Sequence, residues 1–231
     1  MPEEGHLFRR FADLLLRILY HLLLKLQISG QENVPREGPF VAMMNHIYFI
    51  DPVLVSALAP RLIVIMSKKE NYDNPLVGII LKLYGTFPVQ RGELDMTAIR
   101  TSLLVLRQGH GLLMAPEGTR SRQAALQEGH DGMAWLALRS GAPIVPVALS
   151  GQEGLGQHLK RLRRTPVRVV FGPAFCLRSV GGLAQREQLR HMTAEAMYAL
   201  AALLPPQYRG VYSDLSKTTS RFIVSCQAEG N

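Results

Sequence analysis

One histidine and one aspartate stand out in residues 43–52, which read MMNHIYFIDP. His46 and Asp51 are separated by four residues, most of them apolar. A neutral imidazole with a pKa near about 6.5 can take a proton from an alcohol, and a neighbouring carboxylate can fix its tautomer. Two interpretations follow: an incidental buried histidine before a helix cap, or a general base with its orienting acid.

The elements around this pair decide whether the two side chains can meet. On one continuous helix, five residues rotate a side chain by roughly 140°, so they would point apart. The run PFVAMMNH is typical of a buried strand, and DPVLVSAL begins a helix with Asp51 as N-cap and Pro52 at the first helical position. Across a strand end and a short turn, the carboxylate can return to the imidazole. We therefore expect Asp51 both to cap the helix and to orient the ring.

Two arginines are candidates for binding an anion. Arg91 ends the stretch GTFPVQR and Arg120 lies in APEGTRS, so each should emerge at a strand end or in the loop beyond it. A guanidinium group matches phosphate oxygens bidentately. Either arginine taken alone is more simply a solvated surface charge.

Composition limits the classes of protein and partner. The 231 residues suffice for one sizeable domain, and 47% hydrophobic residues exclude a disordered chain. The net charge of +8 suits an anionic partner such as a lipid surface, a phosphorylated substrate or nucleic acid. Aromatic and basic residues are not interleaved, and we expect no nucleic-acid binding. Cys176 and Cys226 lack metal-ligand spacing and predict reduced thiols without a role.

Residues 6–27 are the most helix-like segment, with one polar stripe and a wide apolar face. Twelve Leu, Ile or Phe residues favour membrane insertion by about 0.3–0.6 kcal/mol each, whereas Asp13 and Arg17 oppose it by about 2.5–3.5 kcal/mol each. A membrane span is therefore not expected. Two arrangements stay open, and they can coexist: packing on the protein's own core, or docking in the headgroup layer with the apolar face in the membrane and the basic stripe outward.

Strand-like runs alternate with helical stretches along the rest of the chain, which predicts a single α/β domain with a mostly parallel or mixed sheet flanked by helices. This domain is preceded by the N-terminal amphipathic helical membrane-docking segment. The expected strands are 39–45, 61–66, 85–89, 111–115, 143–149 and 167–171, and residues 183–204 are expected to form a helix. For the basic run 158–166 three interpretations remain: a solvated loop, a membrane-facing patch, or a dock for the phosphate groups of a ligand.

Four stretches in order, NHIYFID, GTFPVQRG, APEGTRS and GAPIVPV, resemble the sequence blocks of the glycerolipid acyltransferase family. The resemblance is closest to the 1-acylglycerol-3-phosphate (lysophosphatidate) acyltransferases and runs from about residue 28 to about residue 212. It implies acyl transfer from acyl-CoA or acyl-acyl carrier protein to the sn-2 hydroxyl of lysophosphatidic acid, at the cytoplasmic face of a membrane. No metal and no further cofactor are implied.

The resemblance also implies roles for individual residues. His46 and Asp51 would be the catalytic base and its partner. Substrate would be bound by residues of the other three blocks: Arg91, Gly92, Glu117, Gly118, Thr119, Arg120 and Pro146. Backbone amides of the Gly118–Thr119 turn are candidates for the oxyanion site. Where the family often has a lysine, this chain has His130, which is expected to be a loop residue and not a second base.

The resemblance divides the chain into a membrane-associating helix at 1–29, an acyltransferase domain at 30–212 and a polar, loosely ordered tail at 213–231. Other acceptors, either glycerol 3-phosphate or another lysophospholipid, remain open. A noncatalytic membrane-surface protein of the same fold is the alternative from a different class.

Overall fold

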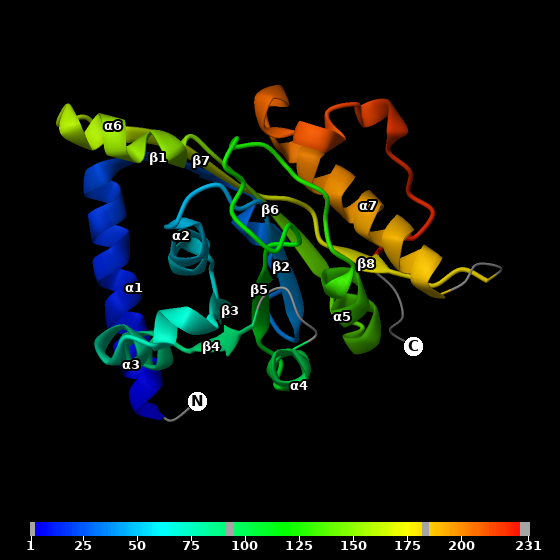
Figure 1. Ribbon diagram of the computed structural model, residues 1–231, viewed down its shortest axis with the longest axis horizontal. Coiled ribbons are helices and arrows are strands. Elements are labelled where there is room, and N and C mark those ends of the chain that lie inside the picture. Colours follow the sequence, from blue (N-terminus) through cyan, green and yellow to red (C-terminus); the bar gives the residue numbers. More distant parts are fainter. Residues whose placement is uncertain (1–2, 91–94, 182–184, 227–231) are drawn as a thin grey trace.

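The computed structural model describes residues 3–90, 95–181 and 185–226, with side chains described from residue 8 onward. Within these residues a mixed sheet of nine strands is flanked by helices on both faces (Figure 1). The strands are β1 (Leu24–Ser29), β2 (Phe40–Met44), β3 (Ile63–Lys68), β4 (Thr86–Val89), β5 (Gly111–Met114), β6 (Ile144–Ser150), β7 (Thr165–Phe171), β8 (Phe175–Leu177) and β9 (Ile223–Ser225). The helices are α1 (Glu3–Leu23), α2 (Asp51–Leu58), α3 (Pro75–Leu83), α4 (Met96–Arg107), α5 (Gly132–Ser140), α6 (Leu155–Lys160) and α7 (Gln185–Leu203).

The main path of the sheet runs in the order β1-β7-β6-β2-β5-β3-β4. Neighbouring strands from β6 to β4 are parallel, whereas β6 and β7 are antiparallel. The parallel strands all end at the same edge, so the loops that follow β2, β5 and β6 emerge together. The six strands and the long helix expected from the sequence are present, with ends shifted by two residues at most.

Different helices cover the two faces of the sheet. On one face, residues of α1 and α2 such as Tyr20, Leu54 and Val55 pack on the sheet. On the other, α4, α5 and α7 contribute buried residues such as Leu106, Met133 and Met197 (Figure 1). The all-buried pattern of β2 and β6 follows from this cover on both faces.

The N-terminal helix ends earlier than the sequence indicates. The expected helix over 6–27 stops at Leu23, and residues 24–29 form β1, which pairs in parallel with β7 from Leu24↔Thr165 to Ser29↔Val170. Leu24, Leu26 and Ile28 alternate with polar residues, and their packing against β7 overrides the local preference for helix. Among the helices of the described residues, none combines the length and hydropathy that a membrane crossing needs.

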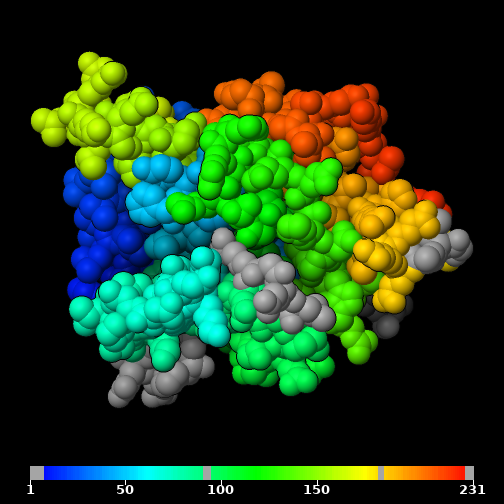
Figure 2. Space-filling view, viewed as in Figure 1, coloured from blue at the N-terminus to red at the C-terminus, as the bar shows by residue number. Residues whose placement is uncertain are grey.

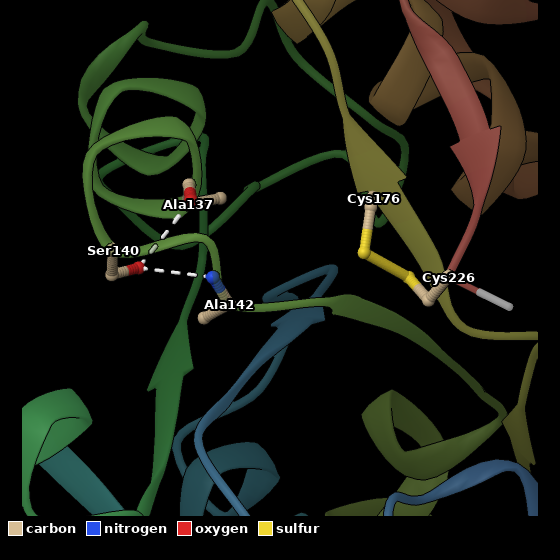
Figure 3. Close-up of a disulfide and its surroundings, with 5 residues drawn as sticks. All are labelled: Ala137, Ser140, Ala142, Cys176 and Cys226. Atoms are coloured by element: carbon tan, nitrogen blue, oxygen red, sulfur yellow. Dashed lines mark hydrogen bonds between the residues drawn. A yellow bond between two sulfur atoms is a disulfide. The ribbon is translucent and has the colours of Figure 1, made fainter. Parts of the chain in front are cut away.

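The C-terminal residues are more ordered than expected. Both oxygens of the buried Glu195 carboxylate accept backbone N–H bonds from residues 221–223, and β9 pairs with β8. The expectation of two reduced thiols is wrong, since Cys176 in β8 and Cys226 after β9 form a disulfide with Cα atoms 5.2 Å apart (Figure 3). Because the two cysteines are 50 residues apart, no local sequence pattern indicated this pairing.

Candidate active site

The loop between β2 and α2 carries the histidine–aspartate pair. Asn45 fixes the point where this loop leaves the sheet: its Nδ2 donates to the Leu149 carbonyl at 2.9 Å, and its Oδ1 accepts from the Leu149 N–H at 2.8 Å. These two hydrogen bonds to β6 replace the backbone hydrogen bonds between the strands at the point where β2 ends. Asn45 was not singled out from the sequence, although a polar side chain closing an apolar run was a usable signal.

His46 and Asp51 meet as the sequence predicts. The His46 Nδ1 and Asp51 Oδ2 atoms are 3.0 Å apart, and the Asp51 side chain is fully buried. Oδ2 also accepts the backbone N–H groups of Ile47 and Tyr48, each at 2.7 Å. Asp51 is therefore not the N-cap that we expected but the first residue of α2, and its carboxylate turns back to close the preceding loop.

His46 is only 7% exposed, so a small part of its surface reaches solvent. Because Asp51 contacts Nδ1, the arrangement favours a proton on Nδ1 and leaves Nε2 as the acceptor. Among the residues that the structure describes, none forms a hydrogen bond with Nε2. Tyr20 of α1 lies behind the pair: burial, with the Asp51 charge as a second cause, raises the pKa of its hydroxyl.

Glu117, in the loop after β5, has a different position from the one that the sequence indicates. It is 3% exposed, and its Oε1 accepts from the His46 N–H at 3.1 Å, while Oε2 accepts from the Gln127 N–H at 3.0 Å. Burial raises the pKa of the Glu117 carboxyl, and the two backbone donors act in the opposite direction. Both oxygens therefore brace the loops around His46 instead of facing the surface.

The rest of this loop lies against His46 and is open to solvent. The Ser121 N–H donates to the His46 carbonyl at 2.7 Å, and the preceding residues Gly118, Thr119 and Arg120 are exposed. Gly118 has φ of 67°, and a Cβ there would approach the His130 ring at 3.1 Å. The His130 N–H donates to the Pro116 carbonyl at 2.8 Å, so His130 supports this turn from one side.

Pro146, a further candidate, lies apart from this cluster. Pro146 is buried inside β6, opposite Met43 of β2, and its carbonyl accepts from the Gly172 N–H at 2.7 Å. It shapes the sheet beneath the site. Arg91 and Gly92 lie outside the described residues. The structure therefore brings together His46, Asp51 and Glu117, with the exposed turn 118–120 beside them.

The chain matches the protein family described as Acyltransferase over residues 25–150, more than half of its length. The 1-acyl-sn-glycerol-3-phosphate acyltransferase of Bacillus subtilis is 27% identical over 186 residues, which cover 80% of this chain and 90% of the relative. The lyso-ornithine lipid O-acyltransferase of Pseudomonas aeruginosa is 32% identical over 165 residues, which cover 65% of this chain and 62% of the relative.

A third relative, the 1-acyl-sn-glycerol-3-phosphate acyltransferase of Borreliella burgdorferi, is 30% identical over 128 residues, or 54% of this chain and 51% of the relative. The chain thus spans nearly all of one of these three relatives and half to two thirds of the others. Among solved structures, the 1-acyl-sn-glycerophosphate (LPA) acyltransferase of Thermotoga maritima matches with a TM-score of 0.60 at 22% identity, over 83% of this chain and 75% of that one. At this identity the similarity establishes the fold.

Proposed function

This chain belongs to the acyltransferase family and is an O-acyltransferase, and from that premise we propose that it acylates the sn-2 hydroxyl of lysophosphatidic acid to give phosphatidic acid. The names of the relatives from Bacillus and Borreliella support this acceptor. The observation that carries the proposal is the His46–Asp51 contact of 3.0 Å, with Nε2 turned away from the carboxylate. Family membership counts against the noncatalytic alternative.

His46 is the general base of the proposed reaction. Nε2 takes the proton from the acceptor hydroxyl as its oxygen attacks the carbonyl carbon of the thioester, and Asp51 stabilises the imidazolium that forms. When the tetrahedral intermediate collapses, the carbon–sulfur bond breaks and the leaving thiolate takes the proton. Positioned general-base catalysis contributes about 10²–10⁴-fold to the rate.

The developing oxyanion needs a hydrogen-bond donor near the turn after Glu117. Of the two amides that the sequence suggested, the Gly118 N–H already donates to the Ala115 carbonyl at 3.0 Å. The Thr119 N–H has no such bond among the described residues, so we assign the oxyanion contact to Thr119.

The acceptor phosphate is assigned to the exposed guanidinium of Arg120, together with Arg91 and the neighbouring Gly92. Arg120 is held near the base because the next residue, Ser121, donates its N–H to the His46 carbonyl. Glu117 has both oxygens engaged with backbone, so we revise its role from binding the acceptor to positioning the His46 loop.

We propose that α1 docks the enzyme on a membrane surface, with the polar side of the helix toward the protein. Arg17 donates to the Ala57 and Ala59 carbonyls at the end of α2. The opposite side of α1 is apolar and exposed: Phe11, Leu14, Leu15, Ile18, Leu19 and Leu22. The neighbouring α3 adds Leu76, Val77, Ile79, Ile80 and Leu83 (Figure 1). An exposed apolar patch of this extent indicates a partner surface, and the acceptor is a lipid.

Membrane docking is tested with Ile18→Asp, compared with Leu104→Asp on the exposed side of α4. The Ile18 side chain is 52% exposed and the Leu104 side chain is 54% exposed, so both substitutions leave the core intact. We expect Ile18→Asp to weaken sedimentation with phosphatidylcholine vesicles by about tenfold, because it removes one inserted side chain and adds a charge. Equal binding of the two variants would refute docking through α1.

Two further points of the proposal concern the acyl donor and the side of the membrane on which the enzyme lies. The acyl group comes from acyl-CoA or acyl-acyl carrier protein, and the thioester supplies the activation. We propose the cytoplasmic face of the membrane for the enzyme, but disulfides persist mainly in oxidising compartments. Thiol trapping of Cys176 and Cys226 in intact cells decides the matter, since an oxidised pair would place this domain on the opposite face.

The direct test is an activity matrix of donors and acceptors with purified protein and with His46→Ala. The acceptors are lysophosphatidic acid, glycerol 3-phosphate and a lysolipid with an amino-acid headgroup, which the name of the Pseudomonas relative suggests as a second candidate. We expect phosphatidic acid to form fastest, and Arg120→Gln to raise KM only for acceptors that carry a phosphate. Preference for the amino-acid lysolipid would replace the proposed acceptor.

A further inference from the structure

The last residues of α6 and the residues that follow it carry basic and apolar side chains and form one projecting tip. This α6 tip comprises residues 159–163, Leu159, Lys160, Arg161, Leu162 and Arg163, and all of them are exposed. Acidic residues are absent from the surrounding sequence LGQHLKRLRRTP, residues 155–166. In Figure 2 the yellow-green atoms of this region project from the upper left corner of the molecule.

Leu162 is placed where it contributes nothing to the core. It is 94% exposed, and its backbone φ of 51° lies in the left-handed region that favours glycine or asparagine. Leu159, three residues earlier, is 50% exposed. The Arg163 N–H donates to the His158 carbonyl at 2.9 Å, so the conformation of Leu162 closes the end of α6. The exposure of two leucines among cations is what a contact outside the chain would explain.

Arg164 fixes the tip to the end of the N-terminal helix. Its Nε and Nη2 donate to the Leu24 carbonyl at 3.1 and 2.6 Å, and Leu24 directly follows α1. Figure 1 shows α6 above this end of α1. The tip thus adjoins the exposed apolar side of the helix, where Leu22 is 67% exposed.

The same tip lies at the edge of the sheet that carries the site. Strands β6 and β2 are parallel, so α6 and the His46 loop leave the sheet on the same side. The Tyr48 hydroxyl would lie 3.7 Å from a Cβ placed at Gly156 of α6, which puts the two segments in contact range. The same loop also exposes Phe49, at 61%.

We propose that the α6 tip is a second membrane contact, specific for anionic bilayers, in which Leu162 inserts between headgroups while Lys160, Arg161 and Arg163 bind lipid phosphates. The proposal rests on the membrane docking of α1 described above and extends it. Phosphates of a soluble acyl donor would need the cations but would leave both leucines without a partner. Contact at α1 and at the tip fixes the rotation of the domain about α1 and holds the His46 edge at the lipid surface.

The test measures sedimentation of the full-length protein with two kinds of vesicle: phosphatidylcholine alone, and equal parts of phosphatidylcholine and phosphatidylglycerol. Lys160→Gln/Arg161→Gln/Arg163→Gln should lose about a hundredfold in affinity for the anionic vesicles only, since each surface cation contributes roughly fivefold. Added salt should weaken the binding of the native protein to anionic vesicles more than that of this variant. Leu162→Asp should also weaken binding to the anionic vesicles, and Leu162→Ala should do so by less.

The matched control removes the same charge elsewhere. Arg107, Arg139 and Arg186 are exposed on α4, α5 and α7, and their triple change to Gln should alter anionic binding less than twofold. Equal losses in tip and control variants would show that net charge alone drives binding and would overturn the proposal. Unchanged binding of the tip variant would overturn it as well.

Acyl transfer to a short-chain lysophosphatidate dissolved in water separates this proposal from the proposed function. The tip variant should keep the native rate there and lose it with acceptor presented in anionic vesicles. A tip variant that is impaired with the soluble acceptor, with a raised KM for the donor, would assign the cations to the donor and overturn the proposal. Absence of transfer by the native protein would overturn the proposed function, while the vesicle comparison would still decide the role of the tip.

Discussion

Two buried polar clusters join distant parts of this chain, and they differ in how completely their atoms are used. The proposed active site, named the catalytic cluster, is His46, Asp51 and Glu117, and it links the loops after β2 and β5. The anchor cluster is Arg9, Asp13, Ser56 and Tyr84, and it links α1 to α2 and to the end of α3. Arg9 and His46 are both almost inaccessible, at 2% and 7% exposure.

The anchor cluster is saturated. The Arg9 guanidinium donates to Asp13 at 3.1 Å, to the Ile63 carbonyl at 3.1 Å, and to Ser56 and the Tyr84 carbonyl, and it lies 3.8 Å from the centre of the Tyr84 ring. The Tyr84 hydroxyl donates to the other Asp13 oxygen at 2.7 Å. Such a network fixes one geometry and leaves no proton free to move.

The catalytic cluster is left incomplete at two atoms. Within the described residues, His46 Nε2 forms no hydrogen bond and Asp51 Oδ1 is buried without a partner. A buried acceptor without a donor is unfavourable for stability, and functional sites are among the places where one is found. We propose from this comparison that the saturated cluster provides stability and the incomplete one provides chemistry.

His46→Ala should have the largest effect and should act on the rate alone. We expect acyl transfer to fall by about 10²–10⁴-fold, because the general base is lost, with little change in the urea midpoint of unfolding. Initial rates and unfolding curves on the same preparation measure both quantities. A native-like rate would remove His46 from the mechanism.

Arg9→Ala should show the reverse pattern. We expect unfolding to become easier by about 3–5 kcal/mol, since buried carbonyls lose their donor and Asp13 loses its partner. The rate per folded molecule toward a soluble acceptor should stay close to native. Arg10→Ala, at the adjacent exposed position, is the matched control and should change stability by less than about 0.5 kcal/mol.

Glu117→Gln sharpens the comparison through its pH dependence. Because burial raises the pKa of Glu117 above 4.5, the folded state loses stability relative to the unfolded chain as pH rises from that value through the raised pKa. Gln does not titrate, so the stability of the native protein minus that of the variant should fall with rising pH in this window. Urea unfolding at several pH values tests the sign, and a difference that rises with pH would contradict it.

Arg17→Gln should have the smallest effect. The Arg17 guanidinium caps the last carbonyls of α2 from a partly exposed position, so its loss should lower stability by about 0.5–1.5 kcal/mol. Comparing the thermal unfolding of this variant with that of the Arg9 variant ranks the two contacts by their contribution to stability. An equal loss for both would show that α1 is anchored as a whole and not chiefly through Arg9.

The helices α1 and α7 show how far sequence patterns reach. Both are long and amphipathic, and α7 buries apolar residues such as Met192, Ala196 and Leu200 as its pattern predicts. In α1 the sequence pattern identified a polar and an apolar face but not which of the two packs on the domain. Asp13 and Arg17 of the polar stripe contact the domain, and Arg9 is more deeply buried than either. Periodicity defines faces, whereas the surface opposite decides which one is covered.

The sequence by itself determined the alternation of strands and helices, the strand–turn–helix that carries His46 and Asp51, and the family. These features depend on local periodicity and on residues that are five positions apart. Only the tertiary structure decided that Glu117 braces the histidine loop, that Arg9 of α1 turns inward, and that Cys176 meets Cys226. These contacts join residues 50 to 75 positions apart, and a buried polar group takes whichever partner the fold places beside it.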